Sequence, residues 1–239
     1  MADELQSPPL SKEEVKQETK KHIRRFSKRL LIEIGLFLVS LFFFVYIIRE
    51  VVLNNKQTLD NWGWDIVAPL RSPQMTSFMR TITYMGSWYF LIPAYLVLIG
   101  WFLLYRKRKS LSMDIFSIAV TSTVVMFTIK EIFKRDRPLE PLLHAVPGFS
   151  FPSGHSFSSF TFFGLLVYVI VDSKHIRTIW KWIGSICCLL LATIIAVSRV
   201  YLKVHYPSDI IGGFLLCVVW LGISFWVLHA IRGKRFLET

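Results

Sequence analysis

The chain has 239 residues, of which 53% are hydrophobic and only 18% charged, and its mean hydropathy is +0.48. Soluble domains carry about 25% charged residues, so this composition excludes an ordinary soluble protein and predicts an integral membrane protein. A membrane-spanning helix needs about 20 apolar residues, which leaves room for roughly six spans and no second large domain. The net charge of +12 does not indicate a nucleic-acid partner, because most basic residues flank apolar runs.

Residues 1–29 form a basic segment ahead of the first apolar run. We interpret it as an interfacial helix or a topogenic flank, and we favour the flank over a site for anionic headgroups. The run that follows, at 30–48, is too long for a cleaved signal peptide and predicts the first span. The connection at 49–86 is the longest polar one. Its composition predicts turns at 60–64 and 69–73, interfacial positions for Trp62 and Trp64, and a short surface helix at 74–85.

Five more apolar runs predict spans at 88–105, 111–133, 153–171, 180–197 and 208–230, and a basic tail occupies 232–239. The predicted fold is therefore all-α: a polytopic membrane domain of six transmembrane helices over residues 30–231. Eighteen of the 28 Lys and Arg residues lie in the segments that share a side with the N-terminus. This bias predicts cytoplasmic termini in the cell membrane. Six of the ten basic residues on the outer side fall in two short polar segments, which suggests a ligand there.

The first of three polar segments, 130–138, ends the third span with Lys130 and Arg137. They are seven residues apart, about two helical turns, so one helix face can hold both. Arginine offers bidentate contacts to a phosphate and lysine a point charge. Snorkelling to the interface is the alternative explanation for such a pair.

The second polar segment, 151–156, opens the fourth span with Pro152-Ser153-Gly154-His155. The first N–H groups of a helix have no partner within it and form an anion site. Gly154 allows the backbone to approach a phosphate oxygen closely, and Ser153 adds a hydroxyl donor. An ordinary helix cap is the alternative interpretation of the serine.

The third polar segment, 198–209, joins the fifth and sixth spans. His205 and Asp209 are four residues apart, so the carboxylate can orient the imidazole and leave its other nitrogen as nucleophile or base. Arg199 lies six residues upstream and can hold the same anion. An interfacial histidine and a helix-start aspartate are each commonplace alone. On the predicted topology, however, all three segments meet at the outer face and form one phosphate-handling site.

The three segments together resemble the signature of the type-2 phosphatidic acid phosphatase superfamily, the lipid phosphate phosphatases. The signature reads Lys-x6-Arg-Pro, Pro-Ser-Gly-His and Ser-Arg-x5-His-x3-Asp, and this sequence matches all three parts between residues 130 and 209. The resemblance implies that His205 attacks phosphorus and becomes a phosphohistidine, that Asp209 holds it, and that His155 protonates the leaving oxygen. The residues that would bind the phosphoryl oxygens are Lys130, Arg137, Ser153, Gly154 and Arg199.

The resemblance implies a lipid phosphate substrate within the bilayer, no cofactor or metal, and no obligate protein partner. The substrate classes in the family are phosphatidic acid, phosphatidylglycerophosphate, undecaprenyl pyrophosphate and lipid A. A phosphotransferase that uses the same histidine remains an alternative, as does a non-catalytic lipid-binding protein. The extra basic residues Lys134, Arg135 and Lys203 could favour a diphosphate or an anionic headgroup. Aromatic residues around the site could line a lipid portal, although aromatic residues near a bilayer face are expected in any case: Phe149, Phe151, Phe157, Tyr201 and Tyr206.

Overall fold

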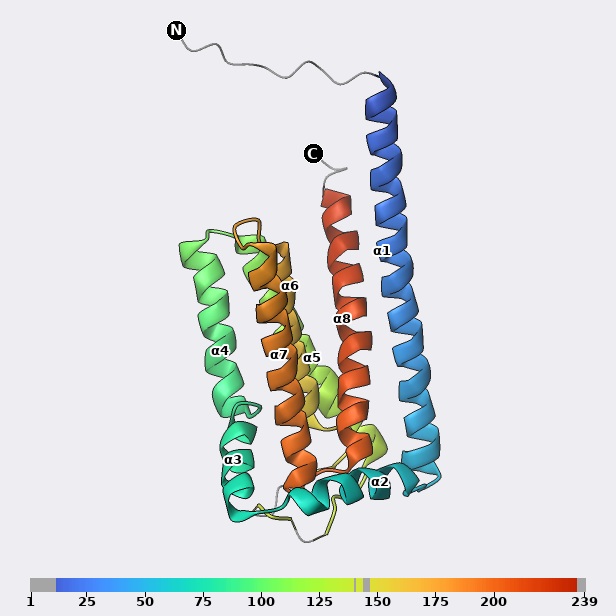
Figure 1. The fold of residues 1–239 in the computed structure, drawn as a ribbon, viewed down its shortest axis with the longest axis vertical. Helices are drawn as coiled ribbons and strands as arrows, with labels where there is room; N and C mark the ends of the chain where they lie inside the picture. Colours follow the sequence, from blue (N-terminus) through green and yellow to red (C-terminus); the bar gives the residue numbers. More distant parts are fainter. Residues whose placement is uncertain (1–11, 140, 144–146, 236–239) are drawn as a thin grey trace. The chain divides into compact units, whose positions relative to one another are not determined.

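The computed structural model describes residues 12–139, 141–143 and 147–235, and over these residues every regular element is a helix. The main helices in chain order are α1 (Lys12–Ile47), α2 (Thr58–Val67), α3 (Pro73–Tyr84), α4 (Trp88–Gly100), α5 (Lys109–Phe133), α6 (Gly154–Asp172), α7 (Thr178–Tyr201) and α8 (Pro207–Arg235) (Figure 1). Short π-helical or 3-10 stretches extend three of them: Ile48–Leu53 after α1, Ala68–Leu70 after α2 and Trp101–Tyr105 after α4.

Six helices in the described part of the chain are long and apolar enough to cross a membrane. They cover Leu30–Leu53, Trp88–Tyr105, Lys109–Phe133, Gly154–Asp172, Thr178–Tyr201 and Pro207–Leu228. The six predicted spans are therefore confirmed, each within a few residues of its predicted ends. The protein is an all-α, multi-pass membrane protein.

The chain divides into two compact units, residues 1–39 and 40–239. In the first unit, α1 begins at Lys12 and continues without a break through position 29, the predicted end of the basic segment. The start of that segment (1–11) and the end of the predicted tail (236–239) lie outside the described residues.

In the second unit, α6 packs against both α7 and α8. An apolar core cluster joins α4, α6 and α7 through Leu91, Phe162 and Ile195. The outward faces are also apolar: the side chains of Leu104 and Trp226, for example, are 77% and 73% exposed. Exposed apolar side chains on a spanning helix are satisfied by lipid, which is as apolar as they are.

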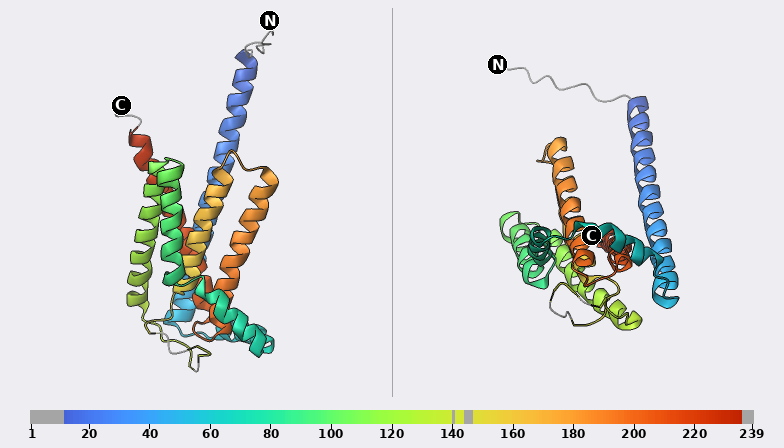
Figure 2. Two further views of the ribbon diagram at one scale, coloured as in Figure 1. Left: turned by 90° about the vertical axis from the view of Figure 1, so that its left-hand side faces the viewer. Right: turned by 60° about the horizontal axis from the view of Figure 1, so that its bottom comes forward.

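The two short helices α2 and α3 lie at the end of this unit where α5 ends and α6 and α8 begin, as Figure 2 shows from two further directions. Helix α3 confirms the surface helix predicted at 74–85. It begins with the Ser72 hydroxyl accepting a hydrogen bond from the Met75 N–H (3.1 Å), followed by a proline in its first turn. This is the favoured start of a helix.

The turn predicted at 60–64 is wrong, because these residues lie inside α2. Asp60 and Gly63 are poor helix formers, which is why the sequence reads as a turn. Tertiary contacts override that preference. The Asp60 side chain is fully buried, and a Cβ atom on Gly63 would lie 2.6 Å from Cγ of Pro207, so α2 packs directly on the first turn of α8. Trp62 is 63% exposed, as an interfacial position requires, whereas Trp64 packs on Tyr206.

Candidate active site

Hydrogen bonds join two described parts of the loop after α5, residues 134–139 and 147–153. Helix α5 closes at Lys134, whose backbone is left-handed (φ 46°) and whose N–H donates to the carbonyl of Lys130. Further along, the N–H of Ser150 donates to the carbonyl of Arg135 (2.7 Å), and its hydroxyl donates to the carbonyl of Asp136 (2.8 Å). These bonds fix the backbone around the basic residues Lys134 and Arg135.

His205 is held between a carboxylate and a guanidinium. Its Nδ1 atom lies 3.3 Å from Oδ2 of Asp209, and its Nε2 atom lies 3.2 Å from Nη1 of Arg137. A guanidinium has donors only, so Nε2 must accept from Arg137. The ring proton is therefore on Nδ1, which donates to Asp209. The lone pair of Nε2 faces the cation, where an anion would bind.

Electrostatics keep His205 neutral. Burial, followed by the positive charges of Arg199, Arg137 and Lys130, lowers the pKa of His205 well below its usual range. Burial likewise lowers the pKa of Arg137 from its ordinary value, against the opposing effect of Asp209. A neutral imidazole whose Nε2 carries a lone pair is the form that can act as a nucleophile.

The three predicted cations lie around this ring, and not all of their hydrogen-bond donors are used within the protein. Arg137 donates to the carbonyls of Gly148 (2.9 Å) and Val204 (2.8 Å), which fixes its guanidinium. Arg199 is 3% exposed and donates from Nη1 to Oγ1 of Thr83 (2.9 Å), while its Nε has no partner. Lys130 donates to the carbonyl of Phe149 (2.5 Å). A buried donor without a partner is costly, so Arg199 is placed for an incoming acceptor.

The start of α6 packs tightly against the start of α8. Ser153 caps α6 with its hydroxyl, and its N–H donates to the carbonyl of Asp209 (3.0 Å). A Cβ atom on Gly213 would lie 2.9 Å from the carbonyl oxygen of Ser153, so only glycine permits this approach. Gly154 follows the cap, and a Cβ atom there would lie 3.8 Å from Cε of Lys130. The start of α6 thus lies beside the Lys130 side chain.

His155 follows in the same turn of α6. Its ring interacts electrostatically with the positive charges of Arg199, Arg137 and Lys130. A Cβ atom on Gly86, in the turn after α3, would lie 2.9 Å from Cδ2 of His155 and 2.5 Å from Cγ2 of Ile195. The glycine therefore lets the end of α3 close over the histidine. The structure brings all eight predicted site residues to one end of the spanning helices.

Sequence reasoning missed several partners of these residues. Arg135 donates to Oδ1 of Asp209 (2.7 Å) and to Oδ2 of Asp60 (2.6 Å), so it is committed to carboxylates rather than open to a diphosphate. Thr83 and Gly86 come from α3 and its turn. No sequence motif marks Asp60, Thr83 or Gly86, because each contacts a site residue that lies 69 or more positions away in the sequence.

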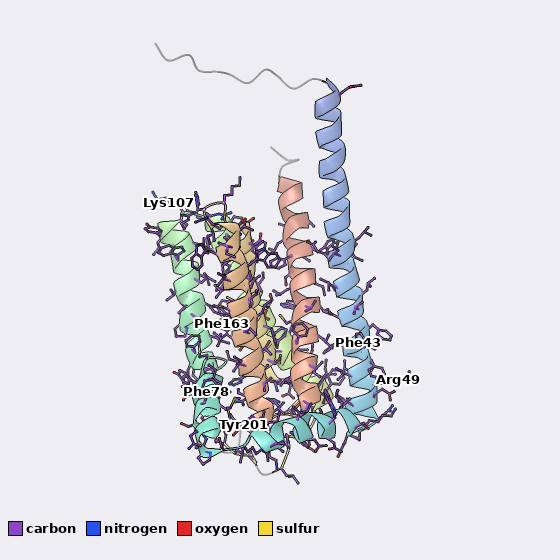
Figure 3. All side chains as sticks on the ribbon, viewed as in Figure 1. Phe43, Arg49, Phe78, Lys107, Phe163 and Tyr201 are labelled. Atoms are coloured by element: carbon purple, nitrogen blue, oxygen red, sulfur yellow. The ribbon has the colours of Figure 1, made fainter. Side chains whose placement is uncertain are left out.

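The predicted aromatic portal is wrong in its main members. Phe151 and Phe157 are fully buried, and Tyr201 is 1% exposed. Figure 3 places Tyr201 at the α3 end of α7, where its hydroxyl lies 3.0 Å from Oγ1 of Thr76. These aromatic residues belong to the packing that supports the site. Tyr206 stacks on Arg135, whose guanidinium carbon lies 4.0 Å from the ring centroid.

The fold and site define a class: a six-span helical membrane protein with a histidine–aspartate pair and three arginine or lysine side chains grouped at one end of its spans. A family model described as the PAP2 superfamily matches residues 111–232. The chain belongs to the PAP2 superfamily, and the predicted resemblance is confirmed.

Individual relatives agree with this assignment. Phosphatidylglycerophosphatase B of Bacillus subtilis (strain 168) is 32% identical over 185 residues, 74% of this chain and 88% of the relative. An undecaprenyl-diphosphatase of Sulfolobus acidocaldarius is 29% identical over 120 residues, 48% of this chain and 53% of the relative. The crystal structure of a transmembrane PAP2-type phosphatidylglycerolphosphate phosphatase from Bacillus subtilis superposes with a TM-score of 0.71 at 28% identity, covering 84% of this chain and 96% of that one.

Proposed function

We propose that this protein is an integral membrane phosphatase that hydrolyses the phosphomonoester or pyrophosphate of a lipid, with its active site on the extracytoplasmic side of the cell membrane. Family membership and the names of the relatives support a lipid phosphatase. One observation carries the proposal: His205 is oriented by Asp209 through Nδ1, and its Nε2 lone pair faces Arg137. An in-line phosphoryl acceptor beside a fixed cation is what phosphoryl transfer requires.

In the first step, Nε2 of His205 attacks phosphorus, an N–P bond forms and the bond to the lipid oxygen breaks. His155 begins this step in its protonated form and donates that proton to the leaving oxygen, which leaves His155 neutral. Asp209 stabilises the positive charge that develops on the imidazole. Lys130, Arg137 and Arg199 neutralise the phosphoryl oxygens throughout, so this scheme gives no role to a metal.

In the second step, a water molecule attacks phosphorus and His155 accepts its proton. The N–P bond breaks, inorganic phosphate leaves, and His205 returns to its neutral form. The balance is one water consumed for each phosphate released. Transfer to another acceptor would differ only in what replaces this water.

The substrate we propose is a lipid phosphate of the phosphatidic acid, phosphatidylglycerophosphate or undecaprenyl pyrophosphate class. Its acyl or prenyl chain would stay in the bilayer while its headgroup enters between the ends of the spans. Two of the relatives act, by their names, on a lipid phosphomonoester and a lipid pyrophosphate.

The test is phosphate release by purified protein in detergent with EDTA, from phosphatidic acid, phosphatidylglycerophosphate, undecaprenyl pyrophosphate and a soluble sugar phosphate. We expect release from at least one of the three lipids, loss of that release in His205→Ala, and full release in His175→Ala. His175 is a matched control because it is exposed at the opposite end of the spans, just after α6. A strict requirement for a divalent ion, or full activity in His205→Ala, would overturn the proposal. Acceptor-dependent lipid products would indicate a transferase.

A further inference from the structure

A buried chain of charges runs from the short helix α2 to the candidate nucleophile. Oδ2 of Asp60 accepts from Nη2 of Arg135 at 2.6 Å, and Nη1 of Arg135 donates to Oδ1 of Asp209 at 2.7 Å. Oδ2 of Asp209 in turn accepts from Nδ1 of His205 at 3.3 Å. Both carboxylates are fully buried. The order is therefore carboxylate, guanidinium, carboxylate, imidazole.

Arg135 fixes Asp209 from one side and the backbone fixes it from the other. Oδ2 of Asp209 accepts from the N–H of Tyr206 (2.9 Å), while Oδ1 is held by Arg135. Arg135 also donates to Oγ of Ser208 (2.8 Å) and lies over the Tyr206 ring. With both oxygens occupied, the carboxylate plane cannot rotate. That plane determines where the imidazole of His205 points.

Asp60 fixes the same assembly to α8. Its second oxygen, Oδ1, accepts from the N–H of Ser208 (2.8 Å), a free donor in the first turn of α8. Gly63, one turn further along α2, allows this contact because it faces Pro207 without a side chain. A helix outside the family signature thus supplies a cap to the helix that carries Asp209.

The charges give Asp60 a second effect. A lone guanidinium against Asp209 would neutralise that carboxylate and weaken its attraction for a developing imidazolium. Because Asp60 faces the other end of the guanidinium, the three groups keep one net negative charge beside His205. Burial opposes the charge of Arg135, but Asp209 and Asp60 outweigh burial and raise the pKa of Arg135, so the guanidinium remains charged.

We propose that Asp60 and Arg135 are positioning residues of the phosphatase: together they fix the carboxylate of Asp209 and preserve its negative charge toward His205, and they thereby link the seating of α2 to the chemical step. This inference rests on the proposed function. Because neither residue contacts the phosphoryl group, it predicts an effect on kcat with KM nearly unchanged. In metal sites, the hydrogen-bond partners that orient a metal-ligating histidine typically contribute roughly 10- to 100-fold to activity. We expect a loss of kcat in the same range when a partner of Asp209 is removed.

The test compares Asp60→Asn with Asp65→Asn, which removes the same charge from an exposed position on the same helix. We expect kcat to fall about 10- to 100-fold in Asp60→Asn, with KM within about threefold, and both constants to be unchanged in Asp65→Asn. In a double-mutant cycle, Asp60→Asn should add little to the loss in Arg135→Gln, because it acts through that arginine. Unchanged kcat in Asp60→Asn, or losses that simply multiply in the double variant, would overturn the proposal.

Two further measurements keep the test decisive. If Asp60→Asn does not fold, Arg135→Lys answers the same question: a point charge cannot hold both carboxylates, so full kcat in Arg135→Lys would contradict the proposal. If the wild-type protein releases no phosphate, the proposed function fails, but the positioning claim is still measurable. Nitrogen-15 NMR should then show His205 protonated at Nδ1 in the wild type and as mixed tautomers in Asp60→Asn; an unchanged tautomer would refute the claim.

Discussion

Two ion pairs at opposite ends of the spans show how differently this protein uses charge. At the site end, Arg135 and Asp60 meet at 2.6 Å with side chains only 13% and 1% exposed. At the other end, which Lys107 marks in Figure 3, Arg108 (the next residue along the chain) and Asp172 meet at 3.6 Å, with side chains 52% and 50% exposed. The residue types are the same. Only the first pair is removed from water.

The two pairs differ in what they contribute to the stability of the fold, in sign as well as in size. An exposed pair contributes about 0–1 kcal/mol and is screened by salt. A buried pair has a large desolvation cost, which hydrogen bonds must offset, and replacement by apolar residues often leaves stability unchanged or improves it. Stability therefore does not explain why the site end carries buried charges. Their value lies in the fixed geometry that they give to Asp209 and His205.

Apart from removal of His205 itself, Asp209→Asn is the change at the site end that we expect to lower kcat the most. The amide keeps the shape but removes the charge that orients Nδ1 and stabilises the imidazolium. We expect kcat to fall by roughly 10²- to 10⁴-fold while some activity remains, as in other histidine–aspartate pairs. Steady-state kinetics on the best lipid substrate would measure it. Wild-type kcat would show that the carboxylate has no part in the reaction.

The spans and the grouping of the motif residues are predictable from the sequence, whereas the buried contacts of α2 are not. All six spans follow from apolar run length, and the span at Trp88–Tyr105 was predicted with its observed ends. The grouping of His155, His205, Asp209 and the three cations followed from motifs at the ends of those runs. Asp60 and Gly63 could not be recognised, because both favour turns in isolation and only the packing of α2 on α8 makes them helical. The buried Phe151 and Phe157 were misplaced for a related reason: an aromatic residue near a span end reads the same whether it faces lipid or the core.

The second prediction concerns a substitution that disturbs the packing at the site end without changing any charge. Gly86→Ala places a methyl group 2.9 Å from the His155 ring and 2.5 Å from Ile195, so one of them must shift. Because small displacements of a catalytic group cost up to about 10²-fold, we expect kcat to fall by roughly 10- to 100-fold. The matched control is Gly100→Ala, where an added Cβ meets nothing within 4 Å. Equal kinetics in the two variants would contradict this prediction.

A third prediction concerns pH. Burial and the charges of Arg199, Arg137 and Lys130 lower the pKa of His205, so its nucleophilic neutral form persists into acid. The kcat/KM value, which reports on the free enzyme, should therefore not decline as pH falls through 6.5. Protonation of His205 should lower kcat/KM by about tenfold per pH unit only below its lowered pKa. A pH–rate profile with buffer controls measures this. An acid limb centred at or above 6.5 would contradict it.

The smallest expected effect is at the exposed pair. Arg108→Gln should change kcat by less than about twofold and the free energy of unfolding by no more than about 1 kcal/mol. Kinetics and thermal unfolding in detergent measure the two quantities. A loss comparable to that of Asp60→Asn would erase the distinction between the two ends.

The most direct test of the central claim, that His205 carries the phosphoryl group, is to trap the intermediate. A lipid substrate with a radiolabelled phosphate would be mixed with the protein and quenched in alkali, where a phosphohistidine survives. We predict label on His205 in the wild type, none in His205→Ala and wild-type labelling in His175→Ala. Sustained turnover with no labelled protein, or label on a different residue, would contradict the account.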